Sequence, residues 1–150
     1  MPSLGAKLPK GKYLLKSKLG GYNMARKRFV IGDCFRDDCP ARDVLNHVSN
    51  RWGGLVLGAL VDRDLRYSEI RARVGGISEK MLAQTLDVLE RDGLIARTSH
   101  PVVPPRVEYA LTANGRALAE RLMDLFTWIG ENVESFVNAQ KRYDSRRESA

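Results

Sequence analysis

The sequence contains only two cysteines and two histidines in 150 residues, too few for a disulfide framework. Cys34, Cys39 and His47 have poor spacing for zinc and no evident fourth ligand, so we predict no metal site. A glycine-rich phosphate loop, an HExxH motif and a recognisable pair of catalytic carboxylates are also absent, so we expect neither an enzyme nor a bound cofactor. No apolar run reaches the ~20 residues of a membrane-spanning helix, and no secretion signal is evident. These absences predict a cytoplasmic protein that does not associate with a membrane.

The composition that remains is that of a soluble globular domain. Hydrophobic residues make up 43% of the chain and charged residues 29%, and the length fits one domain with terminal extensions. The formal net charge is +7, but it is concentrated at one end. Residues 1–32 contain no acid and eight basic residues, whereas the rest of the chain contains 17 basic and 18 acidic residues. The eight are Lys7, Lys10, Lys12, Lys16, Lys18, Arg26, Lys27 and Arg28.

Residues 1–38 are therefore predicted to form a flexible basic extension. They show no sustained hydrophobic period, and Gly5, Gly11, Gly20 and Gly21 interrupt any helix. Such a segment attracts polyanions without sequence preference. The alternative is that the native chain starts at Met24, where Met-Ala-Arg-Lys-Arg resembles a translation start, and that residues 1–23 precede it.

The folded part is expected to begin with two helices. Pro40 suits the first position of a helix over residues 40–49, whose apolar face contains Val44, Leu45 and Val48. Residues 52–61 are apolar on nearly all sides and indicate a buried helix, although three glycines lower its propensity. Residues 65–67 then form a short extended piece.

A helix-turn-helix pattern follows. Ser68 is a good N-cap for a helix through Val74, and Gly75-Gly76 ends that helix in a turn. Ser78 caps a second helix that runs to Asp92, and glycine follows it. The core face of this second helix is predicted to contain three leucines, with Met81 beside them. They are Leu82, Leu86 and Leu89.

Two strands and a long helix complete the pattern. Residues 94–99 and 106–111 are predicted strands, and the proline-rich connection between them makes a stiff hairpin, as in the wing of a winged helix. Thr112 caps a helix predicted to reach Gln140, after which residues 141–150 form a polar, frayed tail. Its apolar residues repeat every three or four positions, which predicts a seam against a second subunit. They are Leu118, Leu122, Leu125, Ile129, Val133 and Phe136.

The predicted fold is thus mainly α with a small β-hairpin: a winged helix-turn-helix over residues 39–140 with a C-terminal dimerisation helix. Several segments, in order, resemble the HxlR-type family of bacterial winged helix-turn-helix transcriptional regulators, relatives of the MarR group. They are Cys39-Pro40, Arg51-Trp52, Arg66-Tyr67-Ser68-Glu69-Ile70, Gly76-Ile77-Ser78-Glu79-Lys80-Met81-Leu82, Leu89-Glu90-Arg91-Asp92-Gly93-Leu94 and Val103-Pro104-Pro105-Arg106-Val107-Glu108-Tyr109. The resemblance covers roughly residues 39–130. Gly53-Gly54 departs from it, since the family usually continues with helix formers there.

The resemblance implies a homodimer that binds a palindromic operator in double-stranded DNA. The N-terminal half of the second motif helix would enter the major groove, where glutamine pairs with adenine and lysine reaches guanine or phosphate. The candidate contacts on this helix are Ser78, Lys80, Gln84 and Thr85. The alternative is that Lys80 and Gln84 lie on an ordinary solvated helix face.

The wing offers three further candidates for contacts with phosphates or the minor groove. They are Arg97, His100 and Arg106, and Arg66, Arg71 and Arg73 surround the first motif helix. Arg106 has an equally weighted alternative, which is to pair with Glu108 and brace the wing. Basic and acidic residues are nearly balanced in this region, so a DNA surface has to arise by segregation rather than by excess charge.

Some members of the family sense electrophiles or oxidants through the cysteine before that proline, which here is Cys39. Its place at a helix N-terminus favours the thiolate, which oxidants attack, whereas Asp37 and Asp38 oppose this. An oxidised Cys39 could be resolved by Cys34 or by Cys39 of the partner subunit. The alternative is a buried structural cysteine.

Two other functions compete with an operator-binding redox sensor. One is a protein-interaction winged helix that binds no DNA, although the polar second helix lacks the exposed apolar anchors of a docking face. The other is a MarR-like regulator that senses an aromatic ligand. Its pocket would be lined by Trp52, Tyr67, Phe126 and Trp128, which are otherwise core and dimer-seam residues.

Overall fold

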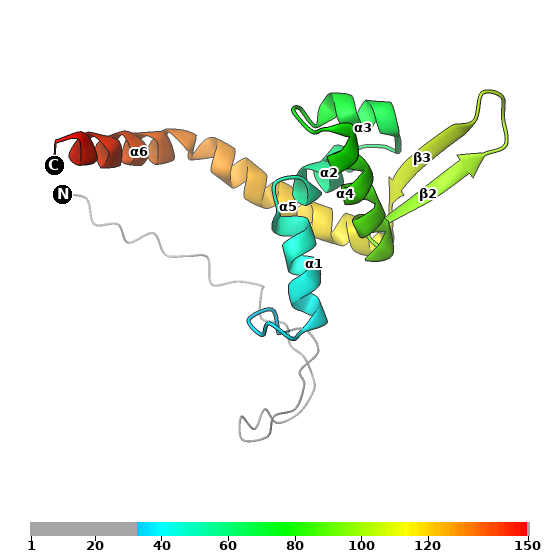
Figure 1. Cartoon of the computed structure of the whole chain (residues 1–150), viewed down its shortest axis with the longest axis horizontal. Helices are drawn as coiled ribbons and strands as arrows, with labels where there is room; N and C mark the ends of the chain where they lie inside the picture. The colour runs from blue at the N-terminus through cyan, green and yellow to red at the C-terminus, as the bar shows by residue number, and fades with distance from the viewer. Residues whose placement is uncertain (1–32, 150) are drawn as a thin grey trace, which may run out of the picture. The chain divides into compact units, whose positions relative to one another are not determined.

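The computed structural model describes residues 33–149, so the predicted basic extension lies outside the described residues as far as residue 32. The described chain contains six helices and one small sheet (Figure 1). In order they are α1 Pro40–Ser49, α2 Gly53–Ala59, β1 Leu65–Arg66, α3 Tyr67–Arg73, α4 Glu79–Arg91, β2 Ile95–His100, β3 Arg106–Leu111, α5 Ala113–Glu131 and α6 Val133–Glu148. The predicted fold class, a mainly helical winged helix-turn-helix, is confirmed.

Helix α2 is at the centre of the core. Val56, Leu57 and Leu60 are almost completely buried. A Cβ at Gly53 would lie 1.9 Å from the carbonyl oxygen of His47, so only glycine allows α2 to follow α1 this closely. The close contact of α2 with the end of α1 therefore explains why glycines stand here, where the family usually has helix formers.

The helix-turn-helix consists of α3 and α4 (Figure 1). The prediction that Ser68 caps α3 is wrong, because Arg66 is the N-cap and its N–H donates to Glu69 Oε2 at 2.8 Å. Glu69 stands three residues after the cap, so its carboxylate satisfies an amide that the helix leaves unbonded. The turn requires glycine at position 76, where φ is +81°. Ser78 caps α4 as predicted, since its Oγ accepts the N–H of Met81 at 3.1 Å.

The wing is a three-stranded antiparallel sheet in the order β1-β3-β2. β2 begins at Ile95, one residue later than predicted, because Leu94 still closes α4. Gly93 has a φ of +71°, and the Leu94 N–H donates to the Leu89 carbonyl at 3.0 Å. β3 has the predicted bounds.

The C-terminal helix differs most from its prediction. It divides at Asn132, where φ is −108° and ψ 11°, and the Asn132 side-chain amide donates from Nδ2 to the Trp128 carbonyl at 2.8 Å. α6 then continues to Glu148, eight residues beyond the expected end. No helix within residues 33–149 is both long enough and apolar enough to cross a membrane.

The predicted dimer seam also divides in two. Leu118 and Leu122 pack against the chain's own core, because the glycines of α2 let α5 approach it closely. The other four seam residues remain at least 39% exposed. They are Leu125, Ile129, Val133 and Phe136.

Candidate nucleic-acid interface

Helix α4 has one buried and one exposed side. Leu82, Leu86 and Leu89 are buried as predicted, whereas Met81 is 38% exposed. Thr85 is buried in its place, and its hydroxyl donates to the Met81 carbonyl at 2.7 Å. We therefore remove Thr85 from the candidate DNA contacts, because its side chain faces the core and its donor is occupied.

The exposed side of α4 contains Lys80 and Gln84. With 3.6 residues per turn, both lie opposite the buried leucines, and Asp87 follows them on the same side. The acid restricts any favourable contact with a polyanion to the first half of the helix. Lys80 and Gln84 are therefore accessible in that first half, and their contact with a groove stays a prediction.

Helix α3 fixes the start of α4. The Tyr67 hydroxyl donates to the Glu79 carbonyl at 2.7 Å, and Arg71 Nη1 lies 2.6 Å from Glu79 Oε1. Because the Ser78 hydroxyl already accepts one N–H of the first turn, a phosphate at this end would find fewer available donors than expected. Arg73 is also paired, with Asp62 at 2.8 Å. The arginines around α3 are therefore partly neutralised.

The three wing candidates do not share one face of the sheet. His100 is the cross-strand partner of Arg106, so their side chains lie on the same face. Arg97 is opposite the buried Tyr109, which places it on the other face. There it lines a hollow of about 310 Å³ with Asp87 and Glu90 of α4. We therefore separate Arg97 from the other two.

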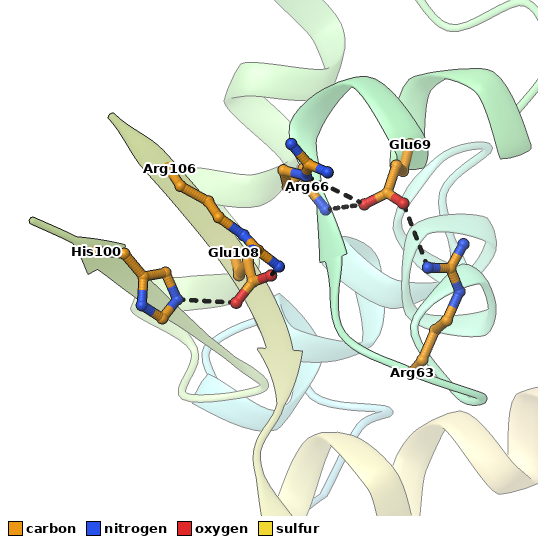
Figure 2. Close-up of polar contacts among 6 residues, drawn as sticks. All are labelled: Arg63, Arg66, Glu69, His100, Arg106 and Glu108. Atoms are coloured by element: carbon orange, nitrogen blue, oxygen red, sulfur yellow. Dashed lines mark hydrogen bonds and ion pairs between the residues drawn. The ribbon is translucent and has the colours of Figure 1, made fainter. Parts of the chain in front are cut away.

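Glu108 joins His100 and Arg106 (Figure 2). Its Oε2 lies 2.8 Å from His100 Nε2, and its Oε1 forms an ion pair with Arg106 Nη2. These hydrogen bonds, first that of Arg106 and then that of His100, hold the pKa of the Glu108 carboxyl below its usual value. The structure thus contains the alternative pairing considered for Arg106.

A second carboxylate, Glu69, was missed by the sequence analysis. Besides accepting the Arg66 N–H, it lies 3.2 Å from Arg63 Nη1 and 3.9 Å from Arg66 Nε (Figure 2). The hydrogen bond from the Arg66 backbone is the main cause of its lowered pKa. The detectable signal was the spacing, since a glutamate three residues after an N-cap indicates a capping interaction.

The cysteines lie before α1. Cys39 is the N-cap residue of α1 and is only 2% exposed. Cys34 Sγ lies 3.8 Å from the Ala41 carbonyl oxygen, and Arg42 donates to the Cys34 carbonyl at 3.0 Å. The far end of α1 is linked to the end of α4, since His47 Nδ1 lies 2.6 Å from Asp92 Oδ2.

Three of the four aromatics of the predicted ligand pocket have different surroundings in the single chain. The Tyr67 hydroxyl is bonded to α4, and Trp128 is 55% exposed with its ring 5.9 Å from that of Phe136. Phe126 lines a hollow of about 260 Å³ beside Gly58 and Met123 instead. Phe126 and Tyr67 thus line separate hollows in the single chain, and the aromatic-ligand pocket stays a prediction.

Comparisons with known proteins agree with this geometry. The sequence model of the HxlR-like helix-turn-helix family matches residues 47–136. The uncharacterized HTH-type transcriptional regulator YtfH of Escherichia coli (strain K12) is 49% identical over 102 residues, which cover 68% of this chain and 81% of that protein. The solved ytfH protein of Salmonella typhimurium has a TM-score of 0.69 and 46% identity, covering 73% of this chain and 98% of that one. The redox regulator HypR in its oxidized form has a TM-score of 0.58 and 33% identity, covering 63% and 97%.

Proposed function

The chain belongs to the HxlR-like helix-turn-helix family of transcriptional regulators, and we propose that it binds a palindromic operator in double-stranded DNA as a homodimer. The observation that carries the proposal is the two-sided α4. Its buried leucines fix the helix in the core, so Lys80 and Gln84 are held outward at the N-terminal half. A helix in this position places the same half in the major groove.

The two side chains have complementary tasks in such a complex. The Gln84 amide has a donor and an acceptor, which match the N7 and N6 positions of adenine. Lys80 carries a positive charge that reaches guanine or a phosphate. We assign base preference mainly to Gln84, because a lysine charge attracts every DNA sequence alike.

The test is to select binding sites from a random DNA library with the full chain and then to measure affinity for single-base variants. We expect two half-sites about 10 bp apart, since each subunit of a dimer presents one α4 to the groove. Gln84→Ala should relax the preference at one position per half-site, with a loss of about 1–3 kcal/mol. Asn138→Ala, an exposed amide of α6 on the side opposite Val133 and Phe136, is the matched control and should change nothing. An unchanged preference at every position in Gln84→Ala would remove Gln84 from the contacts, and a wild type that selects no sequence would refute operator binding.

The homodimer is supported by the apolar surface that α5 and α6 leave uncovered. Leu125, Ile129, Val133 and Phe136 follow one another at helical spacing and are all exposed in the single chain. A continuous apolar stripe of this kind is typical of a subunit contact. Leu118 and Leu122 contribute indirectly, since they fix α5 to the core of their own subunit.

We extend the proposal to regulation through Cys39, with Cys34 or Cys39 of the partner subunit as the second thiol. The likeness to HypR, which is named a redox regulator, supports it. A route to the DNA-binding helix also exists, because α1 begins after Cys39 and is joined to the end of α4 by His47 and Asp92. The burial of Cys39 means that an oxidant reaches it only when the segment before α1 opens. Its reaction should therefore be slower than that of an exposed thiol.

A further inference from the structure

Each of the two carboxylates beside the wing is shared by two basic side chains. Glu108 is bonded to Arg106 and His100, and Glu69 is bonded to Arg63 and Arg66 (Figure 2). We call these six residues the ion-pair face. An acid on a surface that approaches DNA is unfavourable by charge alone, so its position needs a physical reason.

The strand register places four of the six residues on one side of the sheet, and Glu69 and Arg63 are joined to that side through the ion pair of Glu69 with Arg66. Arg66 of β1 is the cross-strand partner of Glu108, and Arg106 is the partner of His100. Directly opposite residues in antiparallel strands point to the same face, and so do alternate residues along a strand. The ion-pair face therefore crosses the sheet from the start of α3 to the hairpin, away from the side that packs on α4.

The basic groups are the outermost groups of this face. The side chains of Arg63, Arg66 and Arg106 are 64%, 56% and 50% exposed, whereas those of Glu69 and Glu108 are 34% and 22% exposed. An arginine has five N–H donors in a rigid plane, and a carboxylate engages at most two or three of them. The remaining donors of each guanidinium stay available to a further anion on the solvent side.

His100 and Arg106 are already expected to contact phosphates from the wing, and we propose that Glu108 and Glu69 are positioning residues, which hold the arginines of the ion-pair face toward the DNA backbone. The inference rests on the proposed function, since it adds a backbone contact to the base contacts of α4. A carboxylate beneath a guanidinium restricts its rotamers before DNA arrives. The ordering cost that a long side chain otherwise incurs on binding is then largely removed.

The two explanations, charge and positioning, predict opposite changes in DNA-binding affinity when the Glu108 carboxylate is removed. If only charge matters, Glu108→Gln removes a repulsion and tightens binding to every DNA. If the carboxylate positions Arg106 and His100, specific binding weakens by about three- to tenfold, which is the cost of ordering one or two side chains. Binding to a non-matching duplex, where fixed positions matter less, tightens in the same variant.

The experiment measures the affinity of the full chain for two duplexes of equal length and composition. One is the duplex that the wild type selects from a random library, and the other is its scrambled sequence. The variants are Glu108→Gln, Glu108→Asp, Arg106→Gln and the Arg106→Gln/Glu108→Gln double variant. Glu120→Gln, an exposed acid of α5, is the matched control. Thermal unfolding of each variant separates lost contacts from lost folding.

We expect Glu108→Gln to weaken the selected duplex and tighten the scrambled one, Glu108→Asp to restore part of the loss, and Glu120→Gln to affect both duplexes equally. Arg106→Gln should lower the slope of log affinity against log salt by about 0.9, the value for one phosphate contact. On the selected duplex the loss in the double variant should be less than the sum of the losses of Arg106→Gln and Glu108→Gln, because part of the effect of Glu108 is exerted through Arg106 and only the rest through His100. Tighter binding of Glu108→Gln to both duplexes, or an unchanged salt slope in Arg106→Gln, would overturn the inference and leave operator binding by α4 intact. A wild type that selects no sequence would instead refute the proposed function.

Discussion

Replacing Gly115 with alanine should destabilise the protein more than the same substitution at two other helical glycines. A Cβ at this position would lie 1.7 Å from the carbonyl oxygen of Leu94 and 2.7 Å from its carbon. These are backbone atoms, and Leu94 is held on both sides. Its N–H donates to the Leu89 carbonyl, and its carbonyl accepts the N–H of Thr112. The start of α5 therefore has to move away from the end of α4 by about 1 Å or more.

The magnitude follows from two opposing effects. Alanine is favoured over glycine inside a helix by about 1 kcal/mol. Overpacking against a well-packed neighbour costs about 1–3 kcal/mol and sometimes more, and here the neighbour is rigid backbone. Because a rigid backbone contact falls at the upper end of that range, we expect a net loss of about 2 kcal/mol or more for Gly115→Ala.

Two glycines serve as graded controls. At Gly58 the nearest atom to an added Cβ is the Met123 sulfur at 3.0 Å, which belongs to a flexible side chain. The cost of displacing that side chain and the gain in helix preference should cancel, so Gly58→Ala should leave the free energy of unfolding nearly unchanged. At Gly130 nothing lies within 4 Å, so alanine should stabilise by about 0.5–1 kcal/mol. The expected order of stability is thus Gly130→Ala, then Gly58→Ala, then Gly115→Ala.

The assay is urea unfolding followed by far-UV circular dichroism, with the slope of free energy against urea compared between variants. All proteins are measured at one concentration, because association of subunits contributes to apparent stability. A Gly115→Ala protein within about 1 kcal/mol of the wild type would refute the reasoning. So would a Gly130→Ala protein as unstable as Gly115→Ala, since no contact opposes that substitution.

Two further predictions follow from the proposed function. Ile129→Glu places a charge in the exposed apolar stripe and should shift the protein from dimer to monomer in sedimentation velocity, whereas Thr127→Glu, on the opposite side of α5, should remain dimeric. A dimeric Ile129→Glu protein or a monomeric wild type would contradict the proposal that this stripe is the contact between subunits. Diamide takes two electrons and two protons from a pair of thiols, so that a disulfide forms and the reagent becomes a hydrazine. It should change the operator affinity of the wild type but not of Cys39→Ser, and the response of Cys34→Ser shows which thiol is the second. Equal responses of the wild type and Cys39→Ser, or none from the wild type, would make Cys39 structural.

The order of elements could be predicted from the sequence because local signals mark most of their boundaries. Pro40 at a helix start, Ser78 before an amphipathic run and Gly93 after it each act within one turn, and the structure has all three in those roles. Ser68 was chosen as a cap by residue type alone. Arg66 is the N-cap instead, because the Glu69 carboxylate accepts its backbone N–H. The residue types that are preferred at N-caps do not by themselves indicate such an interaction.

The site was harder to predict because it depends on which side of an element faces the core. Thr85 was grouped with polar contacts, but it lies on the buried side of α4 with its hydroxyl satisfied within the helix. Arg97 and Arg106 are both in the wing, and only the strand register shows that they lie on opposite faces. Leu118 and Ile129 belong to one periodic stripe, yet the first faces its own core. Periodicity indicates that a face is apolar, but it does not identify what covers it.

The pairing of β1 with β3 has a consequence for how the protein opens. Leu65 is bonded in register with Tyr109, and between them the chain runs through α3, α4 and β2 (Figure 1). Arg66 is both the last residue of β1 and the N-cap of α3, so separating the strands also frees the first turn of the helix-turn-helix. The wing and the two motif helices should therefore unfold locally as one cooperative unit. An amide of β1 would then exchange its hydrogen with solvent at the rate of that whole unit, rather than at the faster rate of a frayed two-residue edge strand.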